Sequence, residues 1–482
     1  MSDAENDRIL RFSELPAAPA RKLSKQCSTF YYRPGSRDYL HAYPDGRAVP
    51  VTEASVRSAL VIEAVIPDKR SADSYLYDVR QNWVLQYDGS MPGYSIGLHE
   101  ENGQLCYCTA APKLIEDISG EGEGALGERW PVIYELLQRL LRDESSGDHQ
   151  LLTFLAALKS SVRALREALD SNNKGAGRSV RPGQAIALVG PRACGKTFVF
   201  EQIIAPLLGG RVVDAFKAFS ADAHGFNGEL LAGEVWKVDD RECSTDARVR
   251  RQFAANLKAY LFSANVSFHP KYRTPLTMVP FARLFIMCND TVENLRVLPE
   301  IGQDIEDKIH LFRCNPTEPP MPTFTDEERQ RYRETVRSEL PWMAGNLEEW
   351  IVPERYREGR SGVATYMHPE LLRGLRRQDP DAMLAELVQV AFEEGLLNGN
   401  PWRGTAAQLR GILTHKDAPN SRQANELLSW PRATGTYLGR MADKARFFEA
   451  EYCVRVRRRG QSRGIEEYEI ALIESQIQGR LI

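Results

Sequence analysis

Apolar residues recur along the chain at two spacings, and each spacing predicts a different kind of element. Between residues 151 and 169 the apolar side chains lie three and four positions apart, which predicts an amphipathic helix. Residues 184–189 and 282–288 are short, nearly continuous apolar runs with the length of buried strands. We therefore expect an α/β domain over about residues 146–345.

The segment before this domain predicts an α+β region over residues 1–145. A hairpin turns at 34–36, a helix covers 55–66, and a strand-rich stretch covers 82–109, with turns at Asp88-Gly89 and Asn102-Gly103. Glycine-rich or polar stretches at 119–127 and 171–177 read as a loop and a linker.

The segment after the domain predicts a helical connector over 346–400 and a last module over 401–482. Thr405 is a candidate N-cap for a helix to residue 413, and further helices are expected around 424–428 and over 431–447. A β-hairpin with a basic tip then covers about 452–472. Three helices followed by a hairpin is the element order of a winged helix.

Composition and charge limit the classes of function. The 482 residues are 43% hydrophobic and 26% charged, as in ordinary globular proteins, and no apolar run approaches the ~20 residues of a membrane span. The N-terminus is acidic and polar, unlike a targeting peptide, and the eight cysteines include no Cys-x-x-Cys pair, so we expect a cytoplasmic protein without membrane association. The net charge of -3 requires any nucleic-acid surface to be local, and residues 401–482 carry 14 Lys/Arg against 9 Asp/Glu.

A glycine-rich loop lies between the strand at 184–189 and a helix predicted over 197–208. Its residues are Gly190, Pro191, Arg192, Ala193, Cys194, Gly195, Lys196 and Thr197. In this context the backbone N–H groups can bind polyphosphate, the Lys196 ammonium can neutralise the β and γ oxygens of ATP, and the Thr197 hydroxyl can ligate Mg²⁺. The loop therefore predicts an ATP site.

Such a loop needs a carboxylate on a neighbouring strand. The strand-like residues 234–238 end at Asp239 and Asp240, which we assign to the metal and to orienting the attacking water. Asn289 follows the run at 282–288 and can hold the water beside the γ-phosphate, because ligands bind at the carboxyl ends of such strands. A solvated acidic strand end and a simple turn asparagine are the alternatives.

The order of these motifs resembles superfamily 3 helicases, and more closely the helicase part of virus- and phage-type primase-helicases. The gaps of 44 residues from Lys196 to Asp240 and 49 from Asp240 to Asn289 suit that family. The resemblance covers about residues 145–320 and rests on the segments 190–197, 226–230, 235–240, 267–271 and 280–289. It implies an AAA+ core, Mg²⁺-dependent ATP hydrolysis at protomer interfaces, and a homo-hexameric ring.

The resemblance also implies groups that act on DNA and on a neighbouring subunit. A hairpin before the Asn289 strand is expected to enter the pore of the ring, where His269, Lys271 and Arg273 would grip successive phosphates. A basic loop without function is the alternative. The trans-acting arginine of the family is replaced by Lys308 at the expected position, so Lys308 and Arg313 are both candidates, and Arg283 is a weaker one.

The last module supplies a second candidate DNA surface. Its predicted long helix carries Arg432, Arg440 and Lys444, and the wing carries Arg457, Arg458 and Arg459. A protein-interaction module is the alternative.

The leading hypothesis is an ATP-dependent DNA helicase or replication initiator of a phage or mobile element, acting on single-stranded or forked DNA. Residues 1–145 lack the carboxylate cluster of a primase, so a separate primase or replication protein is a possible partner. Two rivals are an ATP-gated oligomeric scaffold, such as an antiphage component without processive unwinding, and a sequence-specific DNA-binding regulator.

Overall fold

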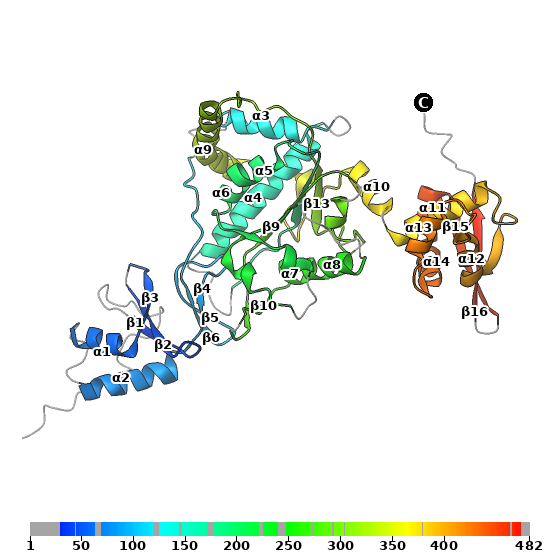
Figure 1. Ribbon diagram of the computed structural model, residues 1–482. Coiled ribbons are helices and arrows are strands. Elements are labelled where there is room, and N and C mark those ends of the chain that lie inside the picture. The colour runs from blue at the N-terminus through cyan, green and yellow to red at the C-terminus, as the bar shows by residue number, and fades with distance from the viewer. Residues whose placement is uncertain are drawn as a thin grey trace, which may run out of the picture. The chain divides into compact units, whose positions relative to one another are not determined.

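Figure 1 shows the computed structural model of the chain. It describes residues 29–43, 45–62, 69–118, 125–143, 147–170, 178–220, 225–239, 247–271, 273–291, 294–302, 304–377, 379–462 and 465–473. The chain forms two compact units, Met1–His368 and Pro369–Ile482. The predicted linker at 171–177 and most of the predicted loop at 119–127 lie outside the described residues. Within the described ranges, no helix is both long and apolar enough to cross a bilayer.

A five-stranded parallel sheet forms the centre of the first unit. Its strands lie in the order β13 (Ile309–Arg313), β7 (Ala185–Val189), β12 (Arg283–Cys288), β9 (Val235–Val238) and β8 (Val212–Asp214). All four pairings are parallel, so every strand ends at the same edge. Every residue of β7 and β12 is buried, which is why these two strands read as continuous apolar runs. The predicted α/β core is confirmed.

Helices cover this sheet and share one apolar core with it. They are α3 (Pro131–Leu140), α4 (His149–Leu169), the run α5 (Lys196–Val199), π-helical Phe200–Ile204 and α6 (Ala205–Leu207), and α9 (Asp326–Glu349). Thr325 and Glu328 cap α9 with reciprocal hydrogen bonds. After β8 in the chain, α7 (Phe216–Ser220) packs against α8 (Ala247–Leu261). Short elements complete the unit: Gly228–Ala232, β10 (Val266–Phe268), β11 (Leu276–Met278), Asn294–Val297 and Glu354–Tyr356.

The N-terminal part of the unit contains two small sheets. One is β1 (Thr29–Arg33), β2 (Asp38–Ala42) and β3 (Ala48–Val51), and the other is β4 (Leu85–Gly89), β6 (Gln104–Cys108) and β5 (Gly97–Glu101). Helices α1 (Glu53–Ile62) and α2 (Lys69–Asn82) lie between them in sequence. The predicted hairpin and the turn at Asn102-Gly103 are confirmed. The turn predicted at Asp88-Gly89 is wrong, because both residues continue β4 and pair with Tyr107 and Cys108.

The second unit combines helices with a three-stranded antiparallel sheet. Its elements are α10 (Pro369–Arg377), α11 (Pro380–Glu393), β14 (Trp402–Thr405), α12 (Ala406–Leu413), α13 (Ser421–Leu427), α14 (Ala433–Asp443), α15 (Ala445–Tyr452), β15 (Val454–Ser462) and β16 (Ile465–Leu472). The predicted N-cap is confirmed, since Thr405 and Gln408 form a capping box. The single helix predicted over 431–447 is wrong. It breaks at Lys444, and the break lets α15 pack against both α11 and β15.

Candidate nucleotide site

The glycine-rich loop starts where β7 lies between its two neighbours in the sheet. Gly190 donates its N–H to the Cys288 carbonyl at 3.2 Å, and Cys314 donates to the Val189 carbonyl at 2.7 Å. A Cβ atom at Gly190 would lie 2.2 Å from the Cys314 carbonyl oxygen, so only glycine fits without moving the backbone. The first residue of the loop is thereby fixed by the strands on both sides.

The rest of the loop folds around the Lys196 side chain. Lys196 is buried, and its Nζ donates to the carbonyls of Gly190 at 2.7 Å and Pro191 at 2.8 Å. Ala193 and Gly195 take positive φ values of +59° and +99°, which turn the chain into the helix that starts at Lys196. The ammonium group therefore lies inside the loop, where successive N–H groups and a helix N-terminus favour an anion.

A cavity of about 410 Å³ opens in front of this loop. It is lined by residues 192–198, Asp239, Met287, Cys288 and Asn289. The structure thus brings Lys196, Thr197, Asp239 and Asn289 to one place, although they come from three separate segments of the chain. Gly190 and Pro191 lie behind the cavity and hold Lys196 through their carbonyls.

The strand order corrects one detail of the sequence interpretation. The strand that carries Asp239 was expected beside the loop strand, but β12 lies between β7 and β9. Asn289 therefore follows β12, which is the direct neighbour of β7. Asp239 follows β9, which lies two strands from β7, roughly 10 Å away in the sheet. Asp239 pairs with Lys237 at 2.8 Å and is 41% exposed, and Asp240 lies outside the described residues.

The candidates for a trans-acting cation lie at different ends of the sheet. Arg313 ends β13 at the same edge as the loop, whereas Lys308 precedes β13 at the opposite edge. The Lys308 side chain is only 11% exposed and pairs with Asp307. Arg283 is buried, and its guanidinium donates to the Ala282 and Arg181 carbonyls and to Ser161 within the same chain. Burial makes Arg283 unavailable to a neighbouring subunit.

Sequence reasoning missed one exposed cation beside Lys308. The Arg360 guanidinium lies 3.7 Å from the Asp307 carboxylate and 5.3 Å from the centre of the Phe262 ring, and its side chain is 55% exposed. No motif points to Arg360, because it lies 52 residues after Lys308 in an irregular segment and is brought there only by tertiary folding.

The hairpin expected before the Asn289 strand is present as β10 and β11. Buried Asn227 fixes its first strand, because its side chain accepts from the His269 N–H at 2.6 Å and donates to the Ser267 carbonyl at 3.1 Å. Arg273 donates to the Asp88 carbonyl at 2.9 Å and lies over the Tyr87 ring. Of the three predicted DNA contacts on this loop, Lys271 is exposed, His269 is half-buried, and Arg273 also joins the loop to β4.

Known proteins resemble this chain in sequence or in overall fold. A family model described as a family of unknown function, DUF5906, matches residues 188–304. The apo A-form structure of the NrS-1 C-terminal region has a TM-score of 0.47 at 14% identity and covers 92% of this chain and 96% of that chain.

Two further solved helicases have lower TM-scores. JCV helicase has a TM-score of 0.24 at 14% identity, over 57% of this chain and 73% of that chain. The active helicase Cch of SCCmec type IV has a TM-score of 0.26 at 10% identity, over 89% and 75%. No curated protein matches the sequence. These likenesses concern the overall fold, so the activity is inferred from the chain's own residues.

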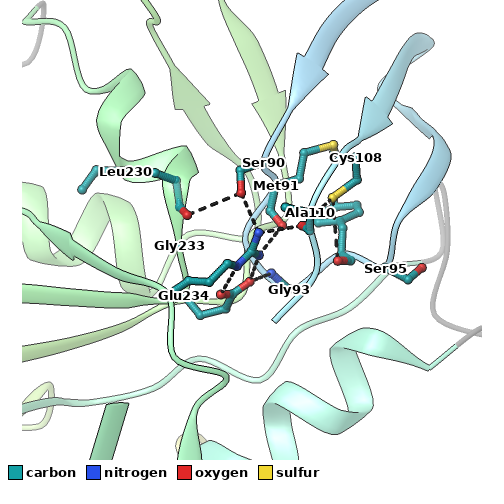
Figure 2. A network of polar contacts seen from close by, with 12 residues as sticks. Ser90, Met91, Gly93, Ser95, Cys108, Ala110, Leu230, Gly233 and Glu234 are labelled. Atoms are coloured by element: carbon teal, nitrogen blue, oxygen red, sulfur yellow. Dashed lines mark hydrogen bonds and ion pairs between the residues drawn. The ribbon is translucent and has the colours of Figure 1, made fainter. Parts of the chain in front are cut away.

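A polar network fixes the segment after β4 against the start of β9 (Figure 2). Glu234 is fully buried and accepts from the Gly93 N–H at 2.8 Å. The Arg211 guanidinium forms a two-point ion pair with Glu234 and also donates to Ser90 Oγ and to the Ala110 and Met91 carbonyls. The N-terminal part is thus bonded to the strand that carries Asp239.

In the second unit, the predicted DNA contacts divide into two groups. Arg440 lies 3.5 Å from Asp381, and Arg458 pairs with Asp443 and Glu466, so both stabilise the unit itself. Arg459 lies 3.8 Å from Glu469. The exposed residues of the predicted set are Arg432, Lys444, Arg457, Arg458 and Arg459.

Proposed function

We propose that this protein is an ATP-driven DNA helicase or replication initiator of a phage or mobile element, and that it works as a homo-hexameric ring. One observation carries the proposal: Lys196, Thr197, Asp239 and Asn289 line a single cavity at the carboxyl edge of a parallel sheet. A lysine on a glycine-rich loop, a hydroxyl, a carboxylate and an amide are the groups that bind a triphosphate and direct a water molecule at it.

The residues present fit Mg²⁺ and a nucleoside triphosphate. Thr197 and Asp239 would hold the metal, which would neutralise the charge that develops on the phosphates, and Asp240 would orient the attacking water. Lys196 would exchange the carbonyls of Gly190 and Pro191 for phosphate oxygens, which offer its ammonium a full negative charge. Asn289 would orient the attacking water with its amide.

Two surfaces would bind DNA under this proposal. Lys271 and His269 lie on the loop of the β10–β11 hairpin, which belongs to the same unit as the nucleotide site. The second unit would act as the winged helix, and the pairing of its strands in the order β14-β16-β15 supports this assignment. Its exposed Arg432, Lys444 and Arg457 would contact the phosphate backbone, since such contacts depend mainly on accessible positive charge.

The trans-acting cation of the ring would be Lys308, Arg313 or Arg360. Of the two cations beside Asp307, Arg360 is the more accessible, because its side chain is 55% exposed and that of Lys308 is 11% exposed. Arg360→Ala is then expected to abolish ATP hydrolysis without preventing ATP binding, whereas Lys308→Ala would retain part of the hydrolysis. Equal losses in the two variants would leave Arg360 without a special role.

The decisive experiment separates ATP use from unwinding. Lys196→Ala is expected to abolish DNA-stimulated ATPase activity. The double variant His269→Ala with Lys271→Ala should keep basal ATPase activity and lose unwinding of a forked duplex. The matched control is the double variant His415→Ala with Lys416→Ala. These two exposed residues are adjacent in the sequence of the second unit, and the variant should unwind normally. Normal unwinding by the hairpin variant would exclude a DNA-gripping role for the loop.

A second candidate function is an ATP-gated scaffold that assembles without processive unwinding. The bonds of Arg273 to Asp88 and of His269 to Asn227 favour it, because they fix the hairpin loop to other parts of the unit. ATPase activity that does not respond to DNA would support the scaffold. The regulator hypothesis predicts instead a selective DNA footprint that survives Lys196→Ala.

A further inference from the structure

Three cysteine thiols surround the start of the glycine-rich loop. Cys194 lies in the loop, Cys288 ends β12, and Cys314 follows β13, and all three residues are at most 2% exposed. The strands on either side of β7 bring them together, through the backbone bonds of Cys288 with Gly190 and of Cys314 with Val189. Nothing in the sequence spacing of these cysteines indicates that they meet.

The Cys314 side chain packs against Gly190 at the start of the loop, where an added Cβ atom would lie 2.8 Å from Cys314 Cβ, and its thiol interacts with that of Cys194. The Lys196 ammonium donates to Cys194 Sγ at 3.5 Å. The hydrogen bond from Cys314, together with the charge of Lys196, lowers the pKa of Cys194 to about 6 despite its burial. Burial and the neighbouring Cys194 raise the pKa of Cys314. The pair is thus a thiolate next to a protonated thiol.

This arrangement differs from that of a metal site or an ordinary buried cysteine. Within the described ranges, no group of three or more His, Cys, Asp or Glu side chains is arranged to hold a metal ion. Cys106, buried in β6, has its pKa raised to about 12 by burial. Cys194 is 2% exposed and lines the nucleotide cavity. A low pKa, a position in the lining of a cavity and a partner thiol are the properties that favour oxidation of a cysteine.

We propose that Cys194 is an oxidation site for peroxides, that Cys314 is its resolving thiol, and that the resulting disulfide blocks the nucleotide site. The Cys194 thiolate attacks hydrogen peroxide, so that an S–O bond forms, the O–O bond breaks, and hydroxide leaves. The Cys314 sulfur then attacks Cys194, an S–S bond forms, the S–O bond breaks, and water leaves with the Cys314 proton. Overall, one thiolate and one thiol are oxidised to a disulfide, and one peroxide is reduced to a hydroxide and a water; the hydroxide becomes a second water when it takes up the proton that Cys194 released on ionising.

The disulfide would act on the nucleotide site in a specific way. It would tie the middle of the loop to the segment after β13, while the loop N–H groups must rearrange around phosphates. It would also remove the negative charge from the sulfur that now accepts from Lys196. Bound nucleotide would in turn cover Cys194, because both occupy the same cavity. Oxidation and nucleotide binding are therefore mutually exclusive.

The test treats the full-length protein with hydrogen peroxide and maps its disulfides by mass spectrometry without nucleotide. We expect a Cys194–Cys314 cross-linked peptide, with Cys106 left reduced as the internal control. ADP binding, measured by calorimetry, should be lost after oxidation and restored by dithiothreitol. Iodoacetamide labelling of Cys194 should rise with a midpoint near pH 6 and be slowed by ADP. Disulfide mapping needs no ATPase activity, so its result is independent of the proposed helicase function.

The Cys314→Ser variant gives the decisive comparison. It should bind ADP before oxidation, form no disulfide at Cys194, and progress to irreversible sulfinic acid under peroxide, so that dithiothreitol no longer restores binding. Cys314→Ala serves the same purpose if serine disturbs folding. Absence of the cross-linked peptide in the natural sequence, or full recovery by dithiothreitol in both Cys314 variants, would overturn the proposal.

Discussion

Removal of the Arg211 side chain tests how firmly the N-terminal part is fixed to the ATPase sheet. Arg211 is the main counter-charge of Glu234, whose side chain is 0% exposed. In Arg211→Met the carboxylate would keep only the Gly93 N–H as a partner. Loss of one partner of a buried ion pair costs about 3–5 kcal/mol, because the remaining charge stays desolvated. Three carbonyl or hydroxyl acceptors around Arg211 would each lose one donor as well.

Hydrogen exchange followed by mass spectrometry measures this loss where it arises. We expect the amides of residues 89–110 and of β9 to exchange roughly 10²- to 10³-fold faster in Arg211→Met, since each 1.4 kcal/mol of opening free energy is a factor of ten. Amides of β13, three strands away from β9 in the sheet, should change much less.

Two further variants test the cause of the effect. Combining Arg211→Met with Glu234→Gln removes the buried charge, so the double variant should be more stable than Arg211→Met alone. Arg163→Ala, which removes an exposed i,i+4 pair with Glu167, should cost less than about 1 kcal/mol. If Arg211→Met exchanges no faster than Arg163→Ala, or if the double variant is the least stable, the ion pair does not fix the N-terminal part.

Three other predictions concern stability. Gly190→Ala should lower the free energy of unfolding by about 1–3 kcal/mol and weaken nucleotide binding, because the new Cβ would lie 2.2 Å from the Cys314 carbonyl oxygen. Urea unfolding measures the first effect and ADP calorimetry the second. Unchanged values in both would refute the close approach. Burial lowers the pKa of His310 to about 3, so its contribution to the free energy of unfolding is present above pH 6.5 and is lost as the pH falls, by about 2 kcal/mol at pH 5. In urea unfolding, His310→Gln should remove that part of the pH dependence. An unchanged pH dependence would contradict this prediction. Thr405→Ala, which breaks the capping box with Gln408, should destabilise α12 by about 1 kcal/mol, seen as faster amide exchange in the first turn of α12 but not in α14.

Local signals in the sequence predicted the elements that carry the site. The strand at 184–189, the helix after the loop and the strand ending at Cys288 all appear where the apolar runs indicated them. The N-cap at Thr405 was predicted for the same reason, since capping depends on residues only three positions apart. Such features are visible in sequence because the interactions that create them are short-range.

Features that depend on pairing between distant segments could not be predicted in this way. Periodicity identifies a strand but not its neighbours, so the position of β12 between β7 and β9 was missed. The edge strand β14 has only four residues and includes a glycine, and its pairing with β16 is what defines it. The break at Lys444 likewise follows from packing against α11, because the local sequence is compatible with an uninterrupted helix.

The same distinction separates the two kinds of functional residue. Lys196 and Thr197 could be identified from sequence because the loop supplies its own geometry. Charged residues whose role depends on a partner far away in the sequence could not be assigned in this way: Arg273 is bonded to Asp88, and Arg440 lies beside Asp381. A surface cation near a predicted DNA site is therefore a strong candidate only when the fold leaves it without an acid to neutralise it. By this criterion, exposed Arg432, Lys444 and Arg457 of the second unit, for which the described residues supply no acid partner, are the places to test DNA binding first.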